Sequence, residues 1–227
     1  MVMPVKTTAI APPSRRMRKD SIPIVEERGK RIFDLLFSTG VLLGTLPIFL
    51  LIALGIRFFS RGPVFFSQER VGRGGKVFRC YKFRTMHLDA EKRLSKLFAS
   101  SPHLRSEWDL TQKLRNDPRI FSFGRFLRVT SLDELPQFWN VLKGEMSVVG
   151  PRPYMVNQKK ILKTHEPKIL SVRPGITGLW QTSGRSQTTF QERIVLDAAY
   201  VDRRSFTSDL LLILKTLPEV FFSTNAY

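Results

Sequence analysis

Residues 35–56, LLFSTGVLLGTLPIFLLIALGI, decide the architecture expected of this chain, because these 22 residues include no charged side chain. As an α-helix they would measure roughly 33 Å, about the thickness of the hydrocarbon core of a bilayer. Such a length argues against a buried helix of a soluble protein. A cleaved signal peptide is also disfavoured, because the stretch begins late and no small-residue cleavage site stands before Arg57. The sequence therefore predicts a membrane anchor over residues 30–60.

The charges on both sides of this apolar stretch bear on how the anchor lies in a membrane. Residues 1–31 hold eight Lys or Arg and three acids, and residues 57–87 hold eight Lys or Arg and one acid. Positive charge resists translocation, so a spanning helix is expected to have one rich and one poor flank. Two rich flanks favour a re-entrant anchor with both ends in the cytoplasm. Pro47 permits the bend by removing a helix hydrogen bond, and Thr45 offers a hydroxyl to a freed carbonyl. The residues alone leave a kinked spanning helix equally open.

The composition restricts the partners of the chain. With 227 residues and 42% apolar residues, the chain is long and apolar enough for a core, which excludes wholesale disorder. Lys and Arg total 37 and Asp and Glu 19, for a net charge of +18. Such a charge favours nucleic acid, anionic lipid or a phosphorylated substrate as partner. The single cysteine, Cys80, is expected to be a small buried hydrophobe, and three scattered histidines disfavour zinc.

Around the anchor the chain divides into a flexible basic tail at residues 1–29 and a domain at residues 61–227. Residues 63–68 and 76–84 are typical of two strands, and the glycines between them predict a hairpin turn. On the second strand Phe78, Cys80, Lys82 and Arg84 are expected to share one face. The C-terminal stretch from Asp209 to Phe222 predicts a helix that lies either in the core or in the membrane interface.

Candidate chemistry begins with the acidic pair in TSLDELPQ, residues 130–137. A capping box with Ser131 as N-cap is disfavoured, because Pro136 would then break a helix hydrogen bond. If Asp133 is the N-cap instead, Pro136 falls where no bond is lost. Asp133 and Glu134 would then sit at a helix N-terminus, where the dipole keeps the Asp133 carboxylate ionised. An ionised Asp is both a potential nucleophile and a ligand for a hard cation, although most such residues are caps only.

Basic side chains in rigid turns follow this pair in the sequence. In Gly150-Pro151-Arg152-Pro153 the prolines present an arginine at low entropic cost, which suits capture of a phosphate. Similar turns occur at residues 173–178 and 184–185. Each alone is typical of an ordinary surface turn, but together with the acidic pair they predict a diphosphate site with a metal ion. The candidate phosphate-binding residues are Lys82, Arg84, Arg152, Arg173 and Arg185.

Five segments resemble one known family, and the resemblance covers about residues 30–227. They are KRIFD at 30–34, KFRTM at 82–86, SLDELPQ at 131–137, LKGEMSVVGPRP at 142–153 and RPGITGLWQ at 173–181. On these motifs the chain resembles the bacterial monotopic polyprenyl-phosphate sugar-1-phosphate transferases. Within that family it looks most similar to the short galactose-type enzymes of exopolysaccharide synthesis. One position departs from the family pattern, since Leu46 stands where a serine usually precedes the proline of the anchor.

The resemblance implies an activity and roles for individual residues. A UDP-sugar, with UDP-galactose or UDP-glucose favoured, would give its sugar-1-phosphate to undecaprenyl phosphate and release UMP, the first step of exopolysaccharide biosynthesis. Asp133 would form a covalent phosphosugar intermediate. Glu134 would help Asp133 to hold Mg²⁺ or would orient it. Lys82 and Arg152 match positively charged active-site positions of the family, and Arg173 and Arg185 would contact phosphates. No residue identifies the sugar.

The resemblance also implies a fold and a location. The fold would be α+β and mostly helical, with a re-entrant membrane helix, a small β-hairpin and interfacial amphipathic helices around the active site. That site would face the cytoplasm at the bacterial inner membrane. Membrane lipid would be a partner and nucleic acid would not, and a homo-oligomer is compatible with the sequence. One alternative is a membrane-tethered binder of nucleic acid or anionic lipid without catalysis, which leaves the acidic pair without a role. Another is a membrane phosphatase or pyrophosphatase.

Overall fold

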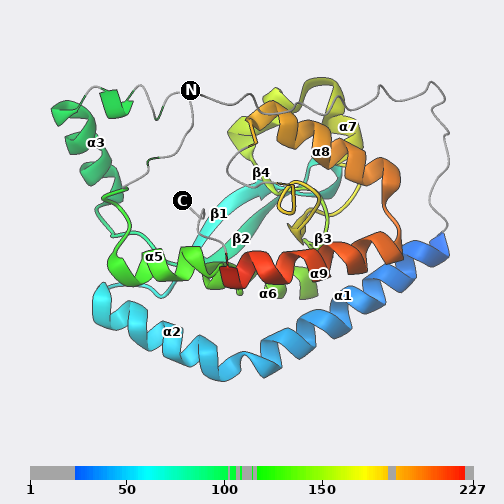
Figure 1. Ribbon diagram of the computed structural model, residues 1–227, viewed down its shortest axis with the longest axis horizontal. Helices are drawn as coiled ribbons and strands as arrows, with labels where there is room; N and C mark the ends of the chain where they lie inside the picture. Colours follow the sequence, from blue (N-terminus) through cyan, green and yellow to red (C-terminus); the bar gives the residue numbers. More distant parts are fainter. Residues whose placement is uncertain are drawn as a thin grey trace, which may run out of the picture.

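The computed structural model describes residues 24–101, 103–105, 108, 114, 117–183 and 188–222. Of the flexible tail predicted for residues 1–29, residues 1–23 lie outside the described residues, and residues 24–29 are not a tail but the start of helix α1. The described chain is mostly helical with two small sheets, which confirms the predicted α+β class. In Figure 1 the first two helices form the lower layer, the sheets lie in the middle, and α7 and α8 lie on the far side of them.

The predicted anchor consists of two helices, α1 (Ile24–Gly44) and α2 (Leu46–Phe59). Among the described residues no single helix has the length and apolarity to cross a bilayer, whereas these two helices together do, with a bend of 59° between them. The break falls where the sequence predicted it. The Thr45 hydroxyl donates to the carbonyl of Val41 at 2.6 Å, and Pro47 lies in the first turn of α2, where a missing N–H costs least.

The β-hairpin is formed by β1 (Phe65–Val71) and β2 (Val77–Phe83), which pair antiparallel and confirm the two predicted strands. Gly74 and Gly75 in the connecting turn have φ angles of 67° and 79°, a conformation that favours glycine. A short strand, β4 (Tyr154–Met155), pairs with β1, so that β2 is an edge strand in the order β2-β1-β4. A separate parallel pair joins β3 (Ser147–Val149) to β5 (Gly175–Thr177).

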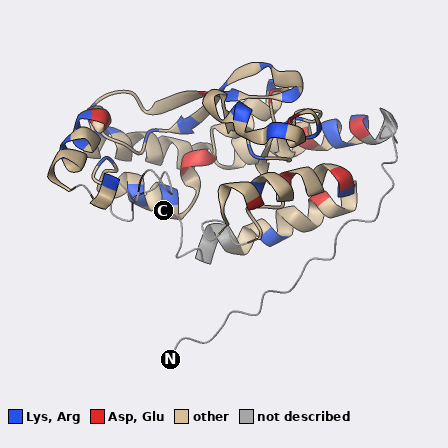
Figure 2. Cartoon of the chain, turned by 90° about the horizontal axis from the view of Figure 1, so that it is seen from above, with Lys and Arg blue, Asp and Glu red and all other residues tan. Residues whose placement is uncertain are grey.

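Helices surround these strands and carry most of the remaining chain. They are α3 (Ala90–Ser100), α5 (Ser122–Val129), α6 (Gln137–Leu142), α7 (Glu166–Ile169), α8 (Phe190–Arg203) and α9 (Phe206–Phe222), with 3₁₀ segments η1 (Arg73–Gly75), η2 (Leu132–Glu134) and η3 (Val156–His165). The helix predicted near the C-terminus is therefore present, with Pro218 inside it. Figure 2 shows Lys and Arg spread over most of these elements instead of gathered on one.

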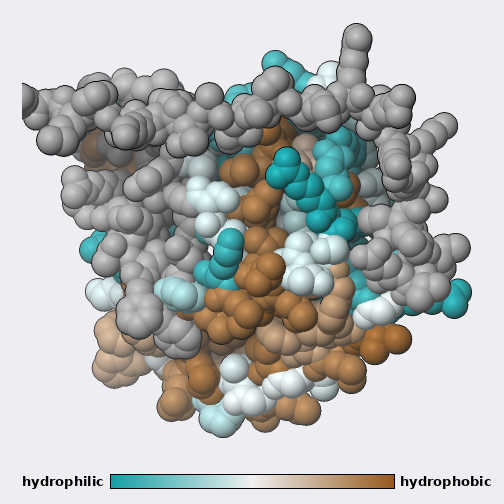
Figure 3. All heavy atoms as spheres, turned by 45° about the vertical axis from the view of Figure 1, so that its right-hand side comes forward, coloured by the Kyte–Doolittle hydropathy of each residue, from teal (hydrophilic) through white to brown (hydrophobic). Residues whose placement is uncertain are grey.

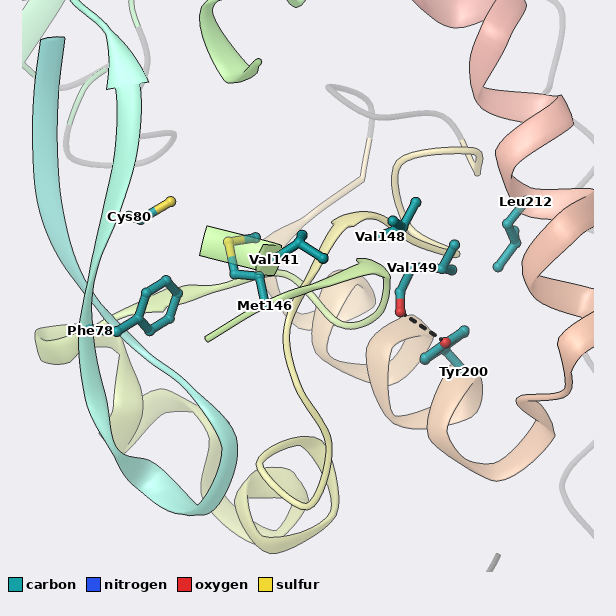
Figure 4. Close-up of a cluster of buried hydrophobic side chains, with 8 residues drawn as sticks. All are labelled: Phe78, Cys80, Val141, Met146, Val148, Val149, Tyr200 and Leu212. Carbon is teal, nitrogen blue, oxygen red and sulfur yellow. Dashed lines mark hydrogen bonds between the residues drawn. The ribbon is translucent and has the colours of Figure 1, made fainter. Parts of the chain in front are cut away.

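The largest core cluster joins the hairpin to the C-terminal helices (Figure 4). Cys80 of β2 is 3% exposed within it, which confirms the expectation of a small buried hydrophobe, and burial raises the pKa of its thiol to about 11. Tyr200 of α8 donates to the carbonyl of Val149 at 3.2 Å, as drawn, and to Asp209 of α9 at 2.8 Å. The cluster therefore fixes β2 and β3, both of which lead to candidate site residues.

Polar contacts fasten α1 to this core through the KRIFD segment. The Lys30 ammonium donates to Asp209 at 2.6 Å, and the carboxylate of Asp34, which is 2% exposed, accepts the backbone N–H of Val148. The Arg31 guanidinium donates to two carbonyls at the end of α6. Because these groups are buried or half-buried, losing one partner would leave the other unsatisfied. This motif therefore sets the direction in which α1 leaves the domain.

Beyond that junction, α1 and α2 expose apolar side chains. Those exposed by half or more are Ile32, Leu36, Leu43, Leu46, Leu50, Leu51, Leu54, Phe58 and Phe59. Figure 3 shows hydrophobic residues concentrated in the lower part of the molecule, where Figure 1 places these two helices. Exposed apolar surface of this extent is typical of a site of association with a membrane or another macromolecule.

Candidate active site

The acidic pair lies in the 3₁₀ turn η2, between α5 and α6. Ser131, directly before it, has a φ of 56°, a left-handed conformation that reverses the chain after α5. The expected register is wrong here, because Asp133 is not the N-cap of α6. That helix begins only at Gln137, after Pro136, whose missing N–H suits the position immediately before a helix. The carboxylate of Asp133 is therefore held by a tight turn and not by the first turn of a longer helix.

Asp133 is a buried carboxylate, with 8% of the residue exposed. The pKa of Asp133 is about 6, above its ordinary value, and burial is the largest cause of this shift. The charge of Glu134 raises the pKa further, whereas the charges of Lys82 and Arg128 lower it. The sequence had predicted that a helix dipole keeps this group ionised. Cationic side chains take that role instead, and they hold the pKa below neutrality against the cost of burial. A carboxylate that is charged and yet poorly solvated is well suited to attack an electrophile.

Lys82 of β2 connects the two acids of the pair. Its Nζ lies 2.5 Å from Oε1 of Glu134 and 3.8 Å from Oδ2 of Asp133. Burial works to lower the pKa of this ammonium, but the two carboxylates outweigh it and raise the pKa above its ordinary value. Lys82 therefore stays charged at neutral pH, and the carboxylates of Asp133 and Glu134 both lie beside its ammonium group.

Two further arginines belong to this site that the sequence analysis did not name. Arg128 of α5 acts on the pKa of Asp133, and its Nε donates to the hydroxyl of Thr85 at 2.9 Å. Arg70 of β1 lies on the same face of the hairpin as Lys82, because Phe66 is the partner of Lys82 in the register and alternate residues share a face. The pKa of the Arg70 guanidinium falls to about 10. Burial is the larger cause and the charge of Arg152 the next, while the charge of Glu134 opposes the shift.

That strand alternation is a signal from which Arg70 could have been identified. Arg128 precedes Asp133 by five residues in a different element, and no pattern in the sequence indicates that it faces the acid.

Arg152 reaches the same region from the turn after β3, and its charge acts on the pKa of Lys82. Its guanidinium lies over the ring of Trp180, 5.0 Å from the centroid, and that of Arg193 lies 5.1 Å from the same centroid. Its backbone N–H donates to Asp197, a fully buried residue that also accepts a 2.6 Å hydrogen bond from Tyr154. Stacking and backbone hydrogen bonds thus hold Arg152 in place, as its flanking prolines suggested.

The other predicted cations lie elsewhere. Arg84 follows the end of β2 and turns toward the end of α2, where its Nη2 donates to the carbonyl of Ser60 at 2.7 Å. Its pKa is lowered by burial and by Arg57, and among the described residues no contact joins it to the acidic pair. Arg173 lies against the start of α1, with its Nε donating to the carbonyl of Gly144. Arg185 lies outside the described residues.

The residues present fit a magnesium ion, although within the described part of the chain no cluster of three or more His, Cys, Asp or Glu side chains occurs. Mg²⁺ at phosphate-transfer sites is commonly bound by one or two carboxylates together with oxygens of the substrate. Asp133 and Glu134 supply two carboxylates that already converge on one cation, the Lys82 ammonium. These two carboxylates would hold such an ion together with oxygens of the substrate.

Comparisons with known proteins identify relatives of this chain. A family model described as bacterial sugar transferase matches residues 25–223. The exopolysaccharide production protein ExoY of Rhizobium meliloti is 42% identical over 198 residues, which cover 87% of this chain and 88% of the relative. The undecaprenyl-phosphate galactose phosphotransferase of Salmonella typhimurium is 41% identical over the same share of this chain but only 41% of its own length. The UDP-glucose:undecaprenyl-phosphate glucose-1-phosphate transferase of Xanthomonas campestris pv. campestris is 38% identical, over 87% of this chain and 40% of the relative.

Proposed function

The chain belongs to the bacterial sugar transferase family, and on that premise we propose that it transfers a sugar-1-phosphate from a UDP-sugar to undecaprenyl phosphate and releases UMP. The substrates named for its relatives support this assignment. The observation that carries it is the buried Asp133 carboxylate, 3.8 Å from the Lys82 ammonium and within the field of Arg128. Membership in a family of transferases favours this activity over that of a tethered binder without catalysis.

The first step of the proposed reaction is attack by a carboxylate oxygen of Asp133 on the phosphorus that carries the sugar. A bond forms between this oxygen and phosphorus, and the bond from phosphorus to the bridging oxygen of UMP breaks. UMP leaves with the electron pair, and the sugar phosphate remains attached to the protein. Phosphoryl transfer of this kind depends on positioning and on neutralising the charge of the phosphate oxygens.

The second step regenerates the carboxylate. An oxygen of undecaprenyl phosphate attacks the same phosphorus, and the bond between phosphorus and Asp133 breaks. The products are undecaprenyl diphosphate sugar and the free carboxylate. A covalent intermediate allows one small site to receive a water-soluble donor and a lipid acceptor in turn.

The cations have distinct places in this reaction. Lys82 and Arg128 lie close enough to Asp133 to act on its pKa, so they would neutralise charge on the phosphate that Asp133 attacks. Arg152, held over Trp180, is placed to bind an outer phosphate oxygen. Glu134, with Asp133, would hold a magnesium ion, which when bound supplies further neutralisation of phosphate charge.

The direct test of this function is a panel of UDP-sugars offered with undecaprenyl phosphate. We expect UMP and a lipid-linked sugar diphosphate in equal amounts from at least one donor, together with loss of turnover on chelation and recovery on addition of Mg²⁺. The measurement is separation of radiolabelled lipid product and assay of UMP. Release of inorganic phosphate without a lipid product would instead identify a phosphatase.

We also propose that α1 and α2 form a re-entrant anchor with both ends on the cytoplasmic side. The 59° break at Thr45, the exposed apolar surface of both helices and the two basic flanks support this topology. It would keep the acidic pair at the depth of lipid headgroups, where the acceptor phosphate lies. The exposed leucines of α9, Leu210, Leu211, Leu214 and Leu217, are suited to rest in the same interface.

Cysteines introduced at the exposed positions Arg28 and Arg61 test the anchor. The native Cys80 is 3% exposed and is the only cysteine in the chain, so it gives little background. In intact cells we expect both new cysteines to resist a membrane-impermeant maleimide, and after permeabilisation we expect both to react. Reaction of one but not the other in intact cells would reject the re-entrant topology in favour of a spanning helix.

A further inference from the structure

Asp197 of α8 is a fully buried carboxylate that has no part in the reaction described so far. It lies where α8 packs beside β4 and the turn that carries Arg152 (Figure 1). Its Oδ2 accepts from the hydroxyl of Tyr154 at 2.6 Å and from the backbone N–H of Arg152 at 3.2 Å. Because a buried carboxylate is costly unless it is hydrogen-bonded, this geometry ties the position of the turn to the state of Asp197.

Two arginines supply the positive charge that Asp197 balances. The guanidiniums of Arg152 and Arg193 both lie over the ring of Trp180, and the charge of each lowers the pKa of Asp197. The pKa of Arg193 shows the same balance, because burial and the charge of Arg152 lower it whereas the charge of Asp197 raises it. Two cations at one aromatic ring repel each other, and the buried carboxylate offsets this repulsion.

The charge of Asp197 can change near neutral pH. Its pKa is about 7, above its ordinary value, and burial is the largest cause of this shift. The hydrogen bonds from Tyr154 and Arg152 and the charges of the two arginines oppose the shift. Burial and the charge of Asp197 also raise the pKa of Tyr154, so the phenol remains a neutral donor. Asp197 is therefore charged above about pH 7 and neutral below it, and a neutral carboxyl accepts both hydrogen bonds more weakly.

We propose that Asp197 is a positioning residue, whose buried carboxylate holds the Arg152 guanidinium where it binds the diphosphate of the sugar donor. The proposal rests on the function proposed above and adds a group that controls donor binding. Because Asp197 is fully buried, it acts through Arg152 and not on the donor itself. Donor binding should therefore weaken when Asp197 loses its charge.

The sign of the pH dependence separates this role from two others. If Asp197 fixes Arg152, protonation of the carboxylate should weaken donor binding, because the turn is then held less firmly. If Asp197 acted only through space, protonation should strengthen binding, because a negative charge near the site repels the phosphates. If Asp197 served only to fill the core, protonation should leave donor binding unchanged.

Donor binding to the Asp133→Asn protein tests this sign, because neither turnover nor ionisation of Asp133 then contributes. The probes are UDP-galactose and UDP-glucose, whose diphosphates do not titrate near pH 7, added to the full chain in phospholipid nanodiscs with Mg²⁺. We expect Kd to be about tenfold higher at pH 6 than at pH 8, since only about a tenth of Asp197 is charged at pH 6. An unchanged Kd, or a lower Kd at pH 6, would overturn the proposal.

Asp197→Asn, added to the same protein, shows whether Asp197 is the group that titrates. The amide oxygen can still accept from Tyr154 and Arg152, so the fold should persist, but no charge remains. We expect Kd at pH 8 to rise about tenfold, to the value of the parent protein at pH 6, and to lose most of its pH dependence. Asp202→Asn, at an exposed carboxylate of the same helix, is the matched control. A pH dependence that persists in Asp197→Asn belongs to another group and rejects the positioning role.

Hydrogen exchange separates failure of this inference from failure of the proposed function, because it requires no donor. The prolines on both sides of Arg152 contribute no amide, which isolates the signal of its N–H. That N–H should exchange faster in Asp197→Asn than in the native chain at pH 8, and about equally fast at pH 6. Equal exchange in both proteins at pH 8 would show that Asp197 does not hold Arg152. If neither donor binds at any pH, the proposed donors fail, and exchange alone decides whether Asp197 positions Arg152.

Discussion

Asp133→Asn is expected to lower turnover by at least about a thousandfold, as loss of a covalent nucleophile does in other enzymes. The amide has the shape of the carboxylate but carries no charge and forms no stable bond to phosphorus. The fold should remain, because burial raises the pKa of Asp133 to about 6 and a neutral side chain at this position therefore relieves the cost of burying a charge. UMP release and thermal melting of the same preparation measure both effects.

Asp202→Asn is the matched control for this substitution. Asp202 is an exposed carboxylate on α8 that pairs with Lys168 at the surface, so the same change there should leave turnover intact.

The covalent step has its own test. Incubated with a sugar-labelled UDP-sugar and no acceptor, the native protein should become labelled and the Asp133→Asn variant should not. Retention of a tenth or more of native turnover by the variant would remove Asp133 as the nucleophile.

Features governed by local chemistry were predictable from the sequence. The uncharged stretch and Pro47 predicted two helices with a break, and the break lies at Thr45. Alternation and glycines predicted the hairpin, and an isolated Cys80 among apolar residues proved to be buried. Each of these conclusions depends on residues that are near one another in the chain. The sequence also predicted that Lys82 and the acidic pair share one diphosphate site, and in the structure the Lys82 ammonium contacts the Glu134 carboxylate.

Features governed by tertiary contacts were not predictable in the same way. Arg128 and Asp197 belong to the site because α5 and α8 pack beside it, and neither element carries a motif that indicates this. Arg84 was placed with Lys82 by extending strand alternation, but β2 ends at Phe83 and the following residue turns toward α2. The expected N-cap at Asp133 failed because a 3₁₀ turn intervenes before α6.

Gly175→Ala is expected to have the largest effect on stability of any single methyl addition in the described chain. Gly175 of β5 lies against the backbone of Gly150 after β3, and the two segments exchange hydrogen bonds through Pro151 and Thr177. A Cβ at Gly175 would lie 2.1 Å from the backbone nitrogen of Gly150 and 2.4 Å from the carbonyl oxygen of Thr177. Neither atom belongs to a side chain that can rotate away, so the two segments must separate.

This separation should lower the free energy of unfolding by about 3 kcal/mol or more, at the upper end of the cost of overpacking. Turnover should fall as well, because Arg152 follows Gly150 by two residues and depends on this turn for its place over Trp180. Gly29→Ala on α1 is the control, since nothing lies within 4 Å of its Cβ and alanine is favoured in a helix. Chemical denaturation of the two variants in one detergent makes the comparison. If Gly175→Ala proves as stable as Gly29→Ala, close backbone contact does not account for the glycines in these two motifs.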